Sequence, residues 1–405
     1  MEENIYRSKL TKEDNHMNEF AYLIKISPEH NNNRYYRMVA EGDNFRIEMG
    51  RIGASPVQMK RPMYLWNETY QKKLQEGYTD RTSYTSVEKT TKSKYRDIPE
   101  PSVKELIDSL MHYANRMLDE SYTISYQDVN EKMLEDAQEL IFQLGQTIDV
   151  RKFNDLLFSL FRIIPRKMKS VSEMAAANGK DMEHILEREQ DLLDLMRTKV
   201  QQEKKTSKKI PDKTILDDLG LDIRLCTEKE NAQIKKFLSS ESAHLFKRAF
   251  RVHNLESDKK FKDYCEQNHI QGKNIHYLYH GSKNMNYIGI MSEGLKLNPK
   301  APITGKMFGH GLYFAPRAKK SINYTSISGS YWAKGSNDQA FLAVFKVAYK
   351  NQKDVMTWEP YMSSLRNIRP HDALFAHAGT SLVNDEIIVY DERQVTLQYL
   401  IELEK

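Results

Sequence analysis

The stretch that decides the fold of this chain is Gly305-Lys306-Met307-Phe308-Gly309-His310-Gly311-Leu312-Tyr313-Phe314-Ala315, followed closely by Lys320-Ser321-Ile322-Asn323-Tyr324. Two further blocks flank it, His280-Gly281-Ser282 before it and Asn384-Asp385-Glu386-Ile387-Ile388-Val389-Tyr390-Asp391 after it. Glycines beside β-forming residues indicate strand ends where backbone N–H and C=O groups can approach a ligand closely. We therefore expect the chemistry to lie between His280 and Tyr324.

Several common catalytic patterns are absent from the sequence. The glycines do not form the G-x-G-x-x-G turn that opens a dinucleotide-binding helix, and neither a P-loop nor an H-E-x-x-H zinc motif occurs. The G-x-S-x-G turn of serine hydrolases is missing as well. These absences exclude the commonest nucleotide-binding, zinc-peptidase and hydrolase patterns.

The composition is typical of a folded protein with several domains. Of the 405 residues, 40% are hydrophobic and 29% are charged, and the net charge is only +5. The mean hydropathy is −0.69, and no unbroken apolar stretch approaches about 20 residues, so no membrane span is expected. Two cysteines exclude a disulfide framework and a cysteine-rich zinc site. The N-terminus shows no secretory signal, so we expect an intracellular protein.

Basic residues concentrate in one part of the chain. Residues 51–96 hold ten basic and four acidic residues, with tyrosines and a tryptophan among them. This pattern is typical of a nucleic-acid surface, but a solvated surface with core aromatics accounts for it equally well. Alternation over residues 34–39 and 45–49 predicts two strands of a small antiparallel sheet, followed by a helix near residues 61–76.

Residues 100–200 are predicted to be entirely helical. Ser102 and Glu105 have the spacing of a capping box at the start of the first helix. Four helices are expected from the apolar spacing, near 102–118, 133–144, 149–165 and 182–200. The charged run 203–209 predicts a linker, although such a lysine cluster also fits a nuclear localisation signal.

The part after residue 210 mixes helices and strands. One or two helices are expected between residues 230 and 250. Residues rich in β-formers predict strands over 275–280, 339–347 and 386–390.

In the four blocks quoted above, the chain resembles the catalytic domain of poly(ADP-ribose) polymerases. The blocks occur in the order and approximate spacing of that family. Residues 100–202 are similar to its autoinhibitory helical domain, and residues 20–98, with Phe45-Arg46-Ile47-Glu48-Met49-Gly50-Arg51-Ile52-Gly53, resemble its WGR domain, which senses DNA ends.

The resemblance implies a multidomain α+β protein. It would consist of a small antiparallel-sheet WGR-like domain, an all-α helical bundle and a mixed α/β ADP-ribosyltransferase domain with antiparallel sheets. The implied boundaries are a tail over 1–19, the WGR-like domain over 20–98, the helical regulatory domain over 99–202, the linker over 203–209 and the catalytic domain over 210–405.

The resemblance also implies NAD⁺ as the substrate, with no metal. The Gly281 backbone would hold the nicotinamide carboxamide and Ser321 would add a hydroxyl, while Tyr324 would stack on the cationic ring at a gain of about 0.5–2 kcal/mol. The implied NAD⁺ contacts are His280, Gly281, Ser282, Asn286, Lys296, Tyr313, Ser321 and Tyr324.

Glu386, with His280 and Tyr313, is the implied catalytic group. Loss of nicotinamide builds oxocarbenium character on the ribose, and a carboxylate bonded to the ribose 2′-hydroxyl would stabilise that charge. In the family, this glutamate also orients the acceptor hydroxyl, so its presence favours polymer formation. Taken singly, each of these residues would be an ordinary structural residue; only the coincidence of the four blocks supports the site.

Met49, Gly50 and Arg51 are the residues that the resemblance places at DNA. Met49 stands where the WGR domain has tryptophan, and the loss of stacking is expected to weaken DNA binding by about 1–3 kcal/mol.

The function implied is a DNA-break-stimulated NAD⁺ ADP-ribosyltransferase that builds poly(ADP-ribose) on itself and other proteins in the DNA damage response. Its partners would be DNA ends or nicks and protein acceptors, with no membrane, and it would be a monomer without DNA. The implied location is the nucleus of a eukaryote, or the cytoplasm or nucleoid of a bacterium. Two alternatives stay open: a DNA-independent mono-ADP-ribosyltransferase, and an inactive scaffold that binds NAD⁺ or DNA.

Overall fold

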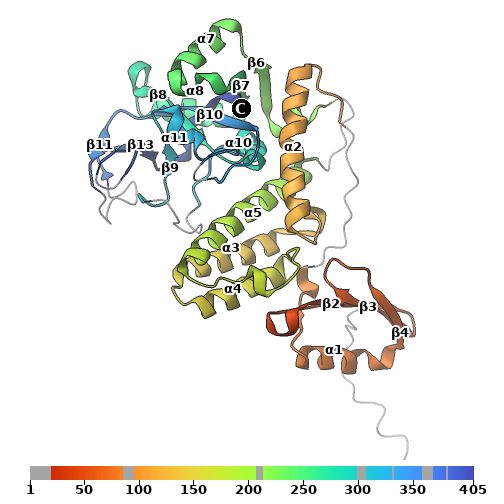
Figure 1. Cartoon of the computed structure of the whole chain (residues 1–405). Coiled ribbons are helices and arrows are strands. Elements are labelled where there is room, and N and C mark those ends of the chain that lie inside the picture. The colour runs from red at the N-terminus through yellow and green to blue at the C-terminus, as the bar shows by residue number, and fades with distance from the viewer. Residues whose placement is uncertain are drawn as a thin grey trace, which may run out of the picture. The chain divides into compact units, whose positions relative to one another are not determined.

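The computed structural model describes residues 20–84, 95–206, 213–298, 307–330, 333–357, 368–379 and 382–405. Four predicted segments lie outside these ranges: the tail, residues 85–94 of the basic stretch, residues 207–212 at the end of the linker and the start of the catalytic domain, and Gly305-Lys306. The described residues form an α+β protein with an N-terminal antiparallel sheet, a helical region and a C-terminal region of helices and mainly antiparallel strands (Figure 1).

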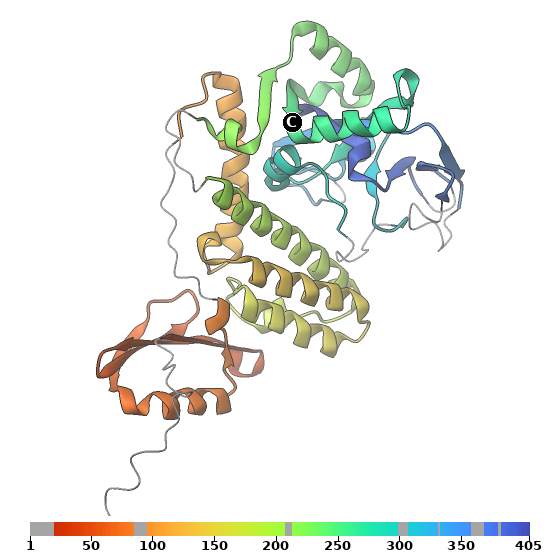
Figure 2. The same ribbon diagram turned by 180° about the vertical axis from the view of Figure 1, so that it is seen from behind.

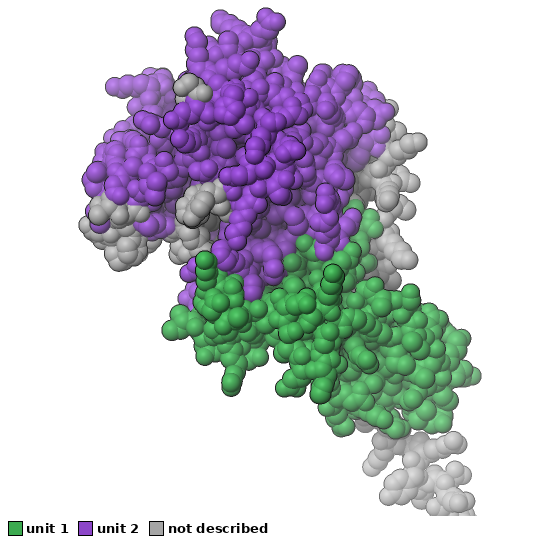
Figure 3. Space-filling model, viewed as in Figure 1, with its two compact units in different colours: residues 1–88, 121–140, 147–182 green, residues 89–120, 141–146, 183–405 purple. Residues whose placement is uncertain are grey.

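The chain divides by its internal contacts into two compact units (Figure 3). The first contains Met1–Glu88, Ser121–Leu140 and Thr147–Met182, and the second contains Lys89–Glu120, Ile141–Gln146 and Glu183–Lys405. The predicted helical block therefore contributes to both units and does not form a unit by itself.

The first unit begins with a five-stranded sheet in which the two predicted strands are confirmed. Its order is β4-β3-β2-β1-β5, with every pair antiparallel. The strands are β1 (Phe20–Ser27), β2 (Asn32–Glu41), β3 (Asn44–Arg51), β4 (Val57–Pro62) and β5 (Thr79–Asp80). Helix α1 (Trp66–Gln75) lies along one face of this sheet, where Trp66 meets Phe45 edge-on at 5.2 Å (Figure 2).

The predicted start of the helix after this sheet was wrong. Residues 61 and 62 finish β4, and a 3₁₀ turn over Met63–Leu65 comes before α1. Pro62 has extended backbone angles, φ −61° and ψ 142°, and so stands before the helix rather than inside it.

The four helices predicted between residues 100 and 200 are confirmed. They are α2 (Pro101–Ser121), α3 (Glu131–Gln146), α4 (Val150–Ile163) and α5 (Gly179–Thr206). Asp149 caps α4 by accepting a hydrogen bond from the Lys152 amide at 2.7 Å. Helix α5 continues to Thr206, so residues 203–206 of the expected linker are helical.

The predicted capping box of α2 was wrong. The helix begins with Pro101, a residue suited to the first helical position because its missing N–H costs nothing there. Glu100 takes the capping role instead, since its carboxylate accepts a hydrogen bond from the Val103 amide at 2.5 Å.

The second unit contains two sheets, and the three strands predicted there are confirmed. A five-stranded sheet has the order β6-β7-β14-β10-β8, and a four-stranded sheet the order β11-β12-β13-β9; of the described strand pairs, only β11 and β12 are parallel. The strands are β6 (Leu221–Leu225), β7 (Phe246–Asn254), β8 (Ile275–Gly281), β9 (Leu312–Phe314), β10 (Gln339–Ala348), β11 (Gln352–Val355), β12 (Ala373–Ala376), β13 (Glu386–Val389) and β14 (Val395–Glu404).

Short helices surround these sheets. They are α6 (Ile215–Leu219), α7 (Glu228–Phe237), α8 (Ser239–Ser242), α9 (Leu255–Gln267), α10 (Tyr287–Glu293) and α11 (Ala318–Ile322). The helical prediction for residues 230–250 was wrong at its end, because residues 246–250 belong to β7, where buried and polar residues alternate.

The five-stranded sheet is buried on both faces, as the apolar run in β10 requires. On one face, Ala343, Phe345 and Val347 pack with apolar residues of α2 and α10. On the other, Leu342 and Val344 pack with residues of α7 and α11, and Ala348 packs with α9. No helix in the described ranges is both long and apolar enough to cross a bilayer.

Candidate active site

The end of β8 meets α11 so closely that position 281 requires glycine. A Cβ atom on Gly281 would lie 1.8 Å from the carbonyl oxygen of Ser321 and 3.2 Å from Cβ of Tyr324. The first distance is far below any van der Waals contact, so a side chain here would force the strand and the helix apart. This close approach brings together three of the residues predicted to hold nicotinamide.

His280 is oriented by the neighbouring strand β9. Its Nδ1 lies 3.0 Å from the carbonyl oxygen of Tyr313, and its ring packs near Phe314 and Phe345, with centroids at 5.9 and 6.1 Å. Because a carbonyl can only accept a hydrogen bond, Nδ1 carries the proton, and in the neutral ring Nε2 is the acceptor. The fold therefore fixes both the orientation and the tautomer of His280.

Tyr313 is held through its hydroxyl group. The hydroxyl donates to the Gly309 carbonyl and accepts from the Phe308 amide, both at 2.9 Å. Burial strongly raises the pKa of the phenol, so the ring is neutral at physiological pH. Because its hydroxyl is hydrogen-bonded to Phe308 and Gly309, Tyr313 can contact a ligand through its ring but does not have its hydroxyl proton available for that ligand.

Glu386 is the first residue of β13, and it forms an ion pair with Lys320 of α11. The two side chains are only 14% and 10% exposed. The Lys320 ammonium also lies 3.3 Å from the carbonyl oxygen of Asn384 and 3.5 Å from that of Asp385. Burial lowers the pKa of Lys320, and the charge of Glu386 opposes that effect.

The side chains of Tyr313 and Tyr324 lie near Glu386. Burial is the main cause of the raised pKa of Tyr324 and of Tyr313, and the charge of Glu386 adds to both shifts. Tyr324 remains 40% exposed, which leaves its ring accessible for stacking. The structure thus groups Glu386 with both tyrosines.

Ser282 and Asn286 lie together beyond the end of β8. The Asn286 amide donates to the Ser282 hydroxyl at 3.0 Å, and the Ser282 backbone amide donates to the Tyr287 hydroxyl at 3.2 Å. Lys296 has a different neighbour, since its ammonium lies 3.4 Å from the Glu392 carboxylate.

Lys296 lines a pocket that also includes Phe345 and Glu392. Glu386, Gly281 and Ser321 are not among the described residues that line this pocket. The structure therefore brings Lys296 together with Phe345, which packs near His280, and not with the group around Glu386.

An acidic part of α5 lies beside the strand end. The Asp191 carboxylate lies 2.6 Å from the Lys283 ammonium. Burial alone would lower the pKa of Lys283. The negative charges of Asp191 and Glu187 together have the larger effect, so the pKa of the lysine is raised. The charge of Glu187 also contributes to the raised pKa of Tyr324. Helix α5 is therefore next to the predicted NAD⁺ contacts.

Sequence reasoning assigned no role to Lys320, Lys283 or Asp191. Lys320 stood inside a quoted block, directly before Ser321, and that position was the only available signal. Nothing in the sequence pairs Asp191 with Lys283, which is 92 residues further along the chain.

The three residues predicted to contact DNA all lie in β3, in the first unit. Met49 is partly buried and packs against the apolar cluster of this sheet. The Arg51 guanidinium donates to the carbonyl oxygens of Asn31 at 3.1 Å and Lys169 at 2.8 Å. Both side chains therefore have structural contacts within the protein, and Gly50 lies between them.

Part of the basic stretch is neutralised by nearby carboxylates. Lys60 pairs with Glu41 at 2.8 Å and Lys73 pairs with Glu76 at 2.6 Å. The edge strand β4, which carries Lys60 and Arg61, is exposed along its whole length.

The described residues contain no group of three or more histidine, cysteine, aspartate or glutamate side chains arranged to hold a metal ion. Cys226 and Cys265 are both buried free thiols.

Comparison with known proteins identifies a domain within the second unit. Residues 228–367 match the poly(ADP-ribose) polymerase catalytic domain. The matched range holds the blocks around His280, Tyr313 and Ser321 and ends before Glu386.

Among the relatives, uncharacterized protein 101L of Invertebrate iridescent virus 6 is 30% identical over 197 residues, which are 47% of this chain and 82% of that protein. The putative poly [ADP-ribose] polymerase-like protein 100L of the same virus is 29% identical, over 38% of this chain and 84% of that protein. The poly [ADP-ribose] polymerase of Drosophila melanogaster is 30% identical over 38% of this chain but only 17% of its own length. Residues 228–367 of this chain therefore form a poly(ADP-ribose) polymerase catalytic domain, and the chain is a distant homologue of these polymerases.

Proposed function

We propose that this chain is an NAD⁺ ADP-ribosyltransferase that is stimulated by DNA breaks and builds poly(ADP-ribose) on itself and on other proteins. The observation that carries the proposal is the placement of Glu386, paired with Lys320, beside Tyr313 and Tyr324 and next to the close contact of Gly281 with Ser321. This arrangement offers a carboxylate, aromatic rings and backbone polar groups to one small ligand.

Nicotinamide fits the groups around Gly281. The backbone N–H and C=O of Gly281 can bond the two polar atoms of the carboxamide, and the Ser321 hydroxyl can add a third bond. The exposed ring of Tyr324 offers an electron-rich face to the cationic pyridinium. Ser282 and Asn286, bonded to each other, would face the adenosine side together with His280, while Lys296 would contribute from the rim of its own pocket.

Glu386 would act on the ribose. The bond between ribose C1′ and the nicotinamide nitrogen breaks, its electron pair leaves with nicotinamide, and positive charge develops on the ribose. A carboxylate that accepts a hydrogen bond from the ribose 2′-hydroxyl stabilises this charge in the transition state. Lys320 would hold that carboxylate in place through their ion pair.

The acceptor then forms the new bond to C1′ and loses its proton. In polymer growth the acceptor is a hydroxyl group of a preceding ADP-ribose unit, and Glu386 would orient it.

Regulation would act through α5. The contact of Asp191 with Lys283, directly after His280-Gly281-Ser282, supports a helix that restricts access of NAD⁺ to the site. DNA would activate the enzyme by binding more tightly to a form in which this helix is loosened. The exposed β4 strand, with Lys60 and Arg61, supports phosphate binding in the first unit.

A second candidate is a transferase that attaches single ADP-ribose units without DNA. It is favoured by the contacts of Met49 and Arg51, because side chains engaged within the protein are not available to stack on or bond to a DNA end.

An automodification assay separates the two candidates. The full chain is incubated with labelled NAD⁺, with and without 5′-phosphorylated nicked duplex DNA, and the products are resolved on a denaturing gel. A ladder of products that requires DNA supports the proposal. Equal single-unit labelling with and without DNA supports the second candidate, and no label on folded protein contradicts both.

A further inference from the structure

A group of polar side chains lies on the face of the five-stranded sheet opposite His280. The strand register pairs Arg224 with Arg251, Arg251 with Tyr399, and Lys346 with Thr396. Paired residues share a face of a sheet, so these side chains project to the same side. Residues 342, 344 and 348 of β10 project there too and pack with α7 and α9, whereas Ala343, the partner of His280, projects to the other side.

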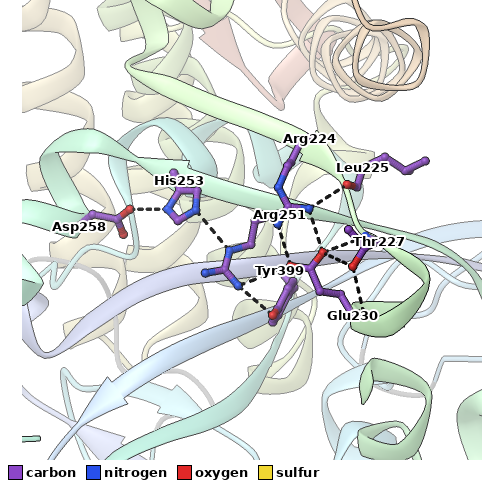
Figure 4. Close-up of polar contacts among 8 residues, drawn as sticks. All are labelled: Arg224, Leu225, Thr227, Glu230, Arg251, His253, Asp258 and Tyr399. Atoms are coloured by element: carbon purple, nitrogen blue, oxygen red, sulfur yellow. Dashed lines mark hydrogen bonds and ion pairs between the residues drawn. The ribbon is translucent and has the colours of Figure 1, made fainter. Parts of the chain in front are cut away.

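Arg251 is held in one orientation by neutral acceptors (Figure 4). Its Nη1 donates to the Tyr399 hydroxyl at 2.8 Å, and its Nε donates to Nε2 of His253 at 3.3 Å. The other ring nitrogen of His253, Nδ1, lies 2.8 Å from the Asp258 carboxylate. Since Nε2 accepts, the proton is on Nδ1 and His253 is neutral, so Arg251 is fixed in place without a counter-charge from these two partners.

The two nearby carboxylates are committed to other groups. Glu230 accepts two hydrogen bonds from Arg224, each of 2.8 Å, and its closest oxygen is 4.0 Å from the Arg251 guanidinium. Asp258 accepts from His253 and from the Thr396 hydroxyl. Glu230 therefore forms only a long ion pair with Arg251, and neither carboxylate accepts a hydrogen bond from it.

Three hydrogen-bond donors in this group have no acceptor among the described residues. Within the described part of the chain, neither Nη2 of Arg251 nor the ammonium of Lys346 makes a hydrogen bond, and the Tyr399 hydroxyl accepts without donating. Lys346 is half-buried, and burial is the main cause of its lowered pKa; the charge of Arg251 lowers the pKa further, while the charge of Asp258 opposes both effects. Two half-buried cations that repel each other favour an anion between them.

We propose that Arg251, Lys346 and Tyr399 bind the phosphate group of a small phosphorylated ligand. Nη2 of Arg251 can donate to one phosphate oxygen, and an ammonium and a hydroxyl can reach the others. The Arg251 side chain is only 20% exposed, and its strand β7 contacts both α7 and α9, which favours a small ligand over a nucleic-acid duplex. This site does not depend on the proposed transferase function.

The test is calorimetric titration of the full chain with inorganic phosphate, without NAD⁺. Lys346→Met should weaken binding about tenfold or more, since a hydrogen bond to a charged group contributes about 1.5–3 kcal/mol. Lys262→Met is the matched control, because Lys262 lies on α9, is 76% exposed and pairs with Glu266, and it should bind phosphate as the native chain does. Tyr399→Phe, which keeps the ring, is the second variant if Lys346→Met unfolds, and it should weaken binding several-fold.

Titrations with AMP and ADP-ribose distinguish the source of the phosphate. A loss in Lys346→Met that is confined to AMP identifies a phosphomonoester, and a loss confined to ADP-ribose identifies a pyrophosphate diester. Equal phosphate affinity in the native chain, Lys346→Met and Tyr399→Phe would overturn the proposal, as would an equal loss in the Lys262→Met control.

Discussion

Lys320 and Glu386 form an ion pair across 66 residues of sequence, with one side chain 10% and the other 14% exposed. The lysine comes from α11 and the glutamate from the start of β13. Since α11 also carries Ser321, one short helix positions both the carboxylate and the contact with Gly281. The geometry of the candidate site therefore depends on α11.

Replacing Lys320 with methionine should slow catalysis while leaving NAD⁺ binding nearly intact. Without the ammonium, Glu386 loses its fixed orientation and its charge partner, and misplacement of a catalytic group costs about a factor of ten to a hundred in rate. The measurement is the kcat and KM of nicotinamide release. The value of kcat should fall, while KM should stay near that of the native chain.

Lys319→Met is the control for this variant, since Lys319 is the neighbouring residue, 70% exposed, and pairs with Glu241. It should behave as the native chain does. An unchanged kcat in Lys320→Met would show that the ion pair has no part in catalysis.

Gly281→Ala should destabilise the second unit and abolish activity. The added methyl group would lie 1.8 Å from the Ser321 carbonyl oxygen, so strand and helix must separate, at a cost of about 1–3 kcal/mol or more. Gly179→Ala, at the start of α5, is the control because a Cβ there meets nothing within 4 Å. Urea unfolding and nicotinamide release measure both effects. Full activity in Gly281→Ala would mean that the backbone contact does not shape the site.

Asp191→Asn should raise the activity measured without DNA. The change removes the charge attraction between α5 and Lys283, and a partly exposed ion pair of this kind contributes up to about 1 kcal/mol, which corresponds to a two- to fivefold gain. Initial rates of NAD⁺ turnover without DNA are compared with those of Glu183→Gln, an exposed position on the same helix. Equal rates in both variants and the native chain would argue against restriction by α5 through this contact.

Glu230 should make the folded state sensitive to acid. Its hydrogen bonds from Arg224 are the main reason that its pKa is lowered to about 2, and Thr227 lowers it further. A carboxyl group with a depressed pKa in the folded state contributes stability above its ordinary pKa of about 4.3, and that contribution is lost as the pH falls towards 2. In urea unfolding between pH 5 and 3, Glu230→Gln should lose less stability than the native chain.

Glu228→Gln, two residues earlier on α7, is the control, and it should show the native pH dependence. If Glu230→Gln and the native chain lose stability in parallel, the pairing with Arg224 does not stabilise the folded state.

The fold could be predicted from the sequence where local signals agree. Asp149 before an amphipathic run and Pro165 after it predicted α4, and the structure confirms that Asp149 caps this helix. Alternation predicted β2 and β3. The errors came from competing local signals: Glu100 rather than Ser102 caps α2, because Pro101 occupies its first position.

The candidate site was predictable only as far as the family blocks reach. They named Gly281, Ser321 and Tyr324, which the structure brings into contact. They could not name the partner of Glu386, or the contact of Asp191 with Lys283, because such pairs join residues far apart in the sequence through the packing of α5 and α11. Side-chain contacts of this range follow from tertiary structure and have no periodic signal.

The most direct test of the central claim is transfer of labelled ADP-ribose by the full chain, in parallel with Glu386→Gln and Glu404→Gln. Glu404 is a 52% exposed carboxylate that pairs with Lys247 at the end of β14, so its variant controls for the loss of one negative charge. The account predicts that Glu386→Gln stays folded, binds NAD⁺ and loses transfer by about a hundredfold or more, while Glu404→Gln keeps it. Transfer at the native rate by Glu386→Gln would contradict the account.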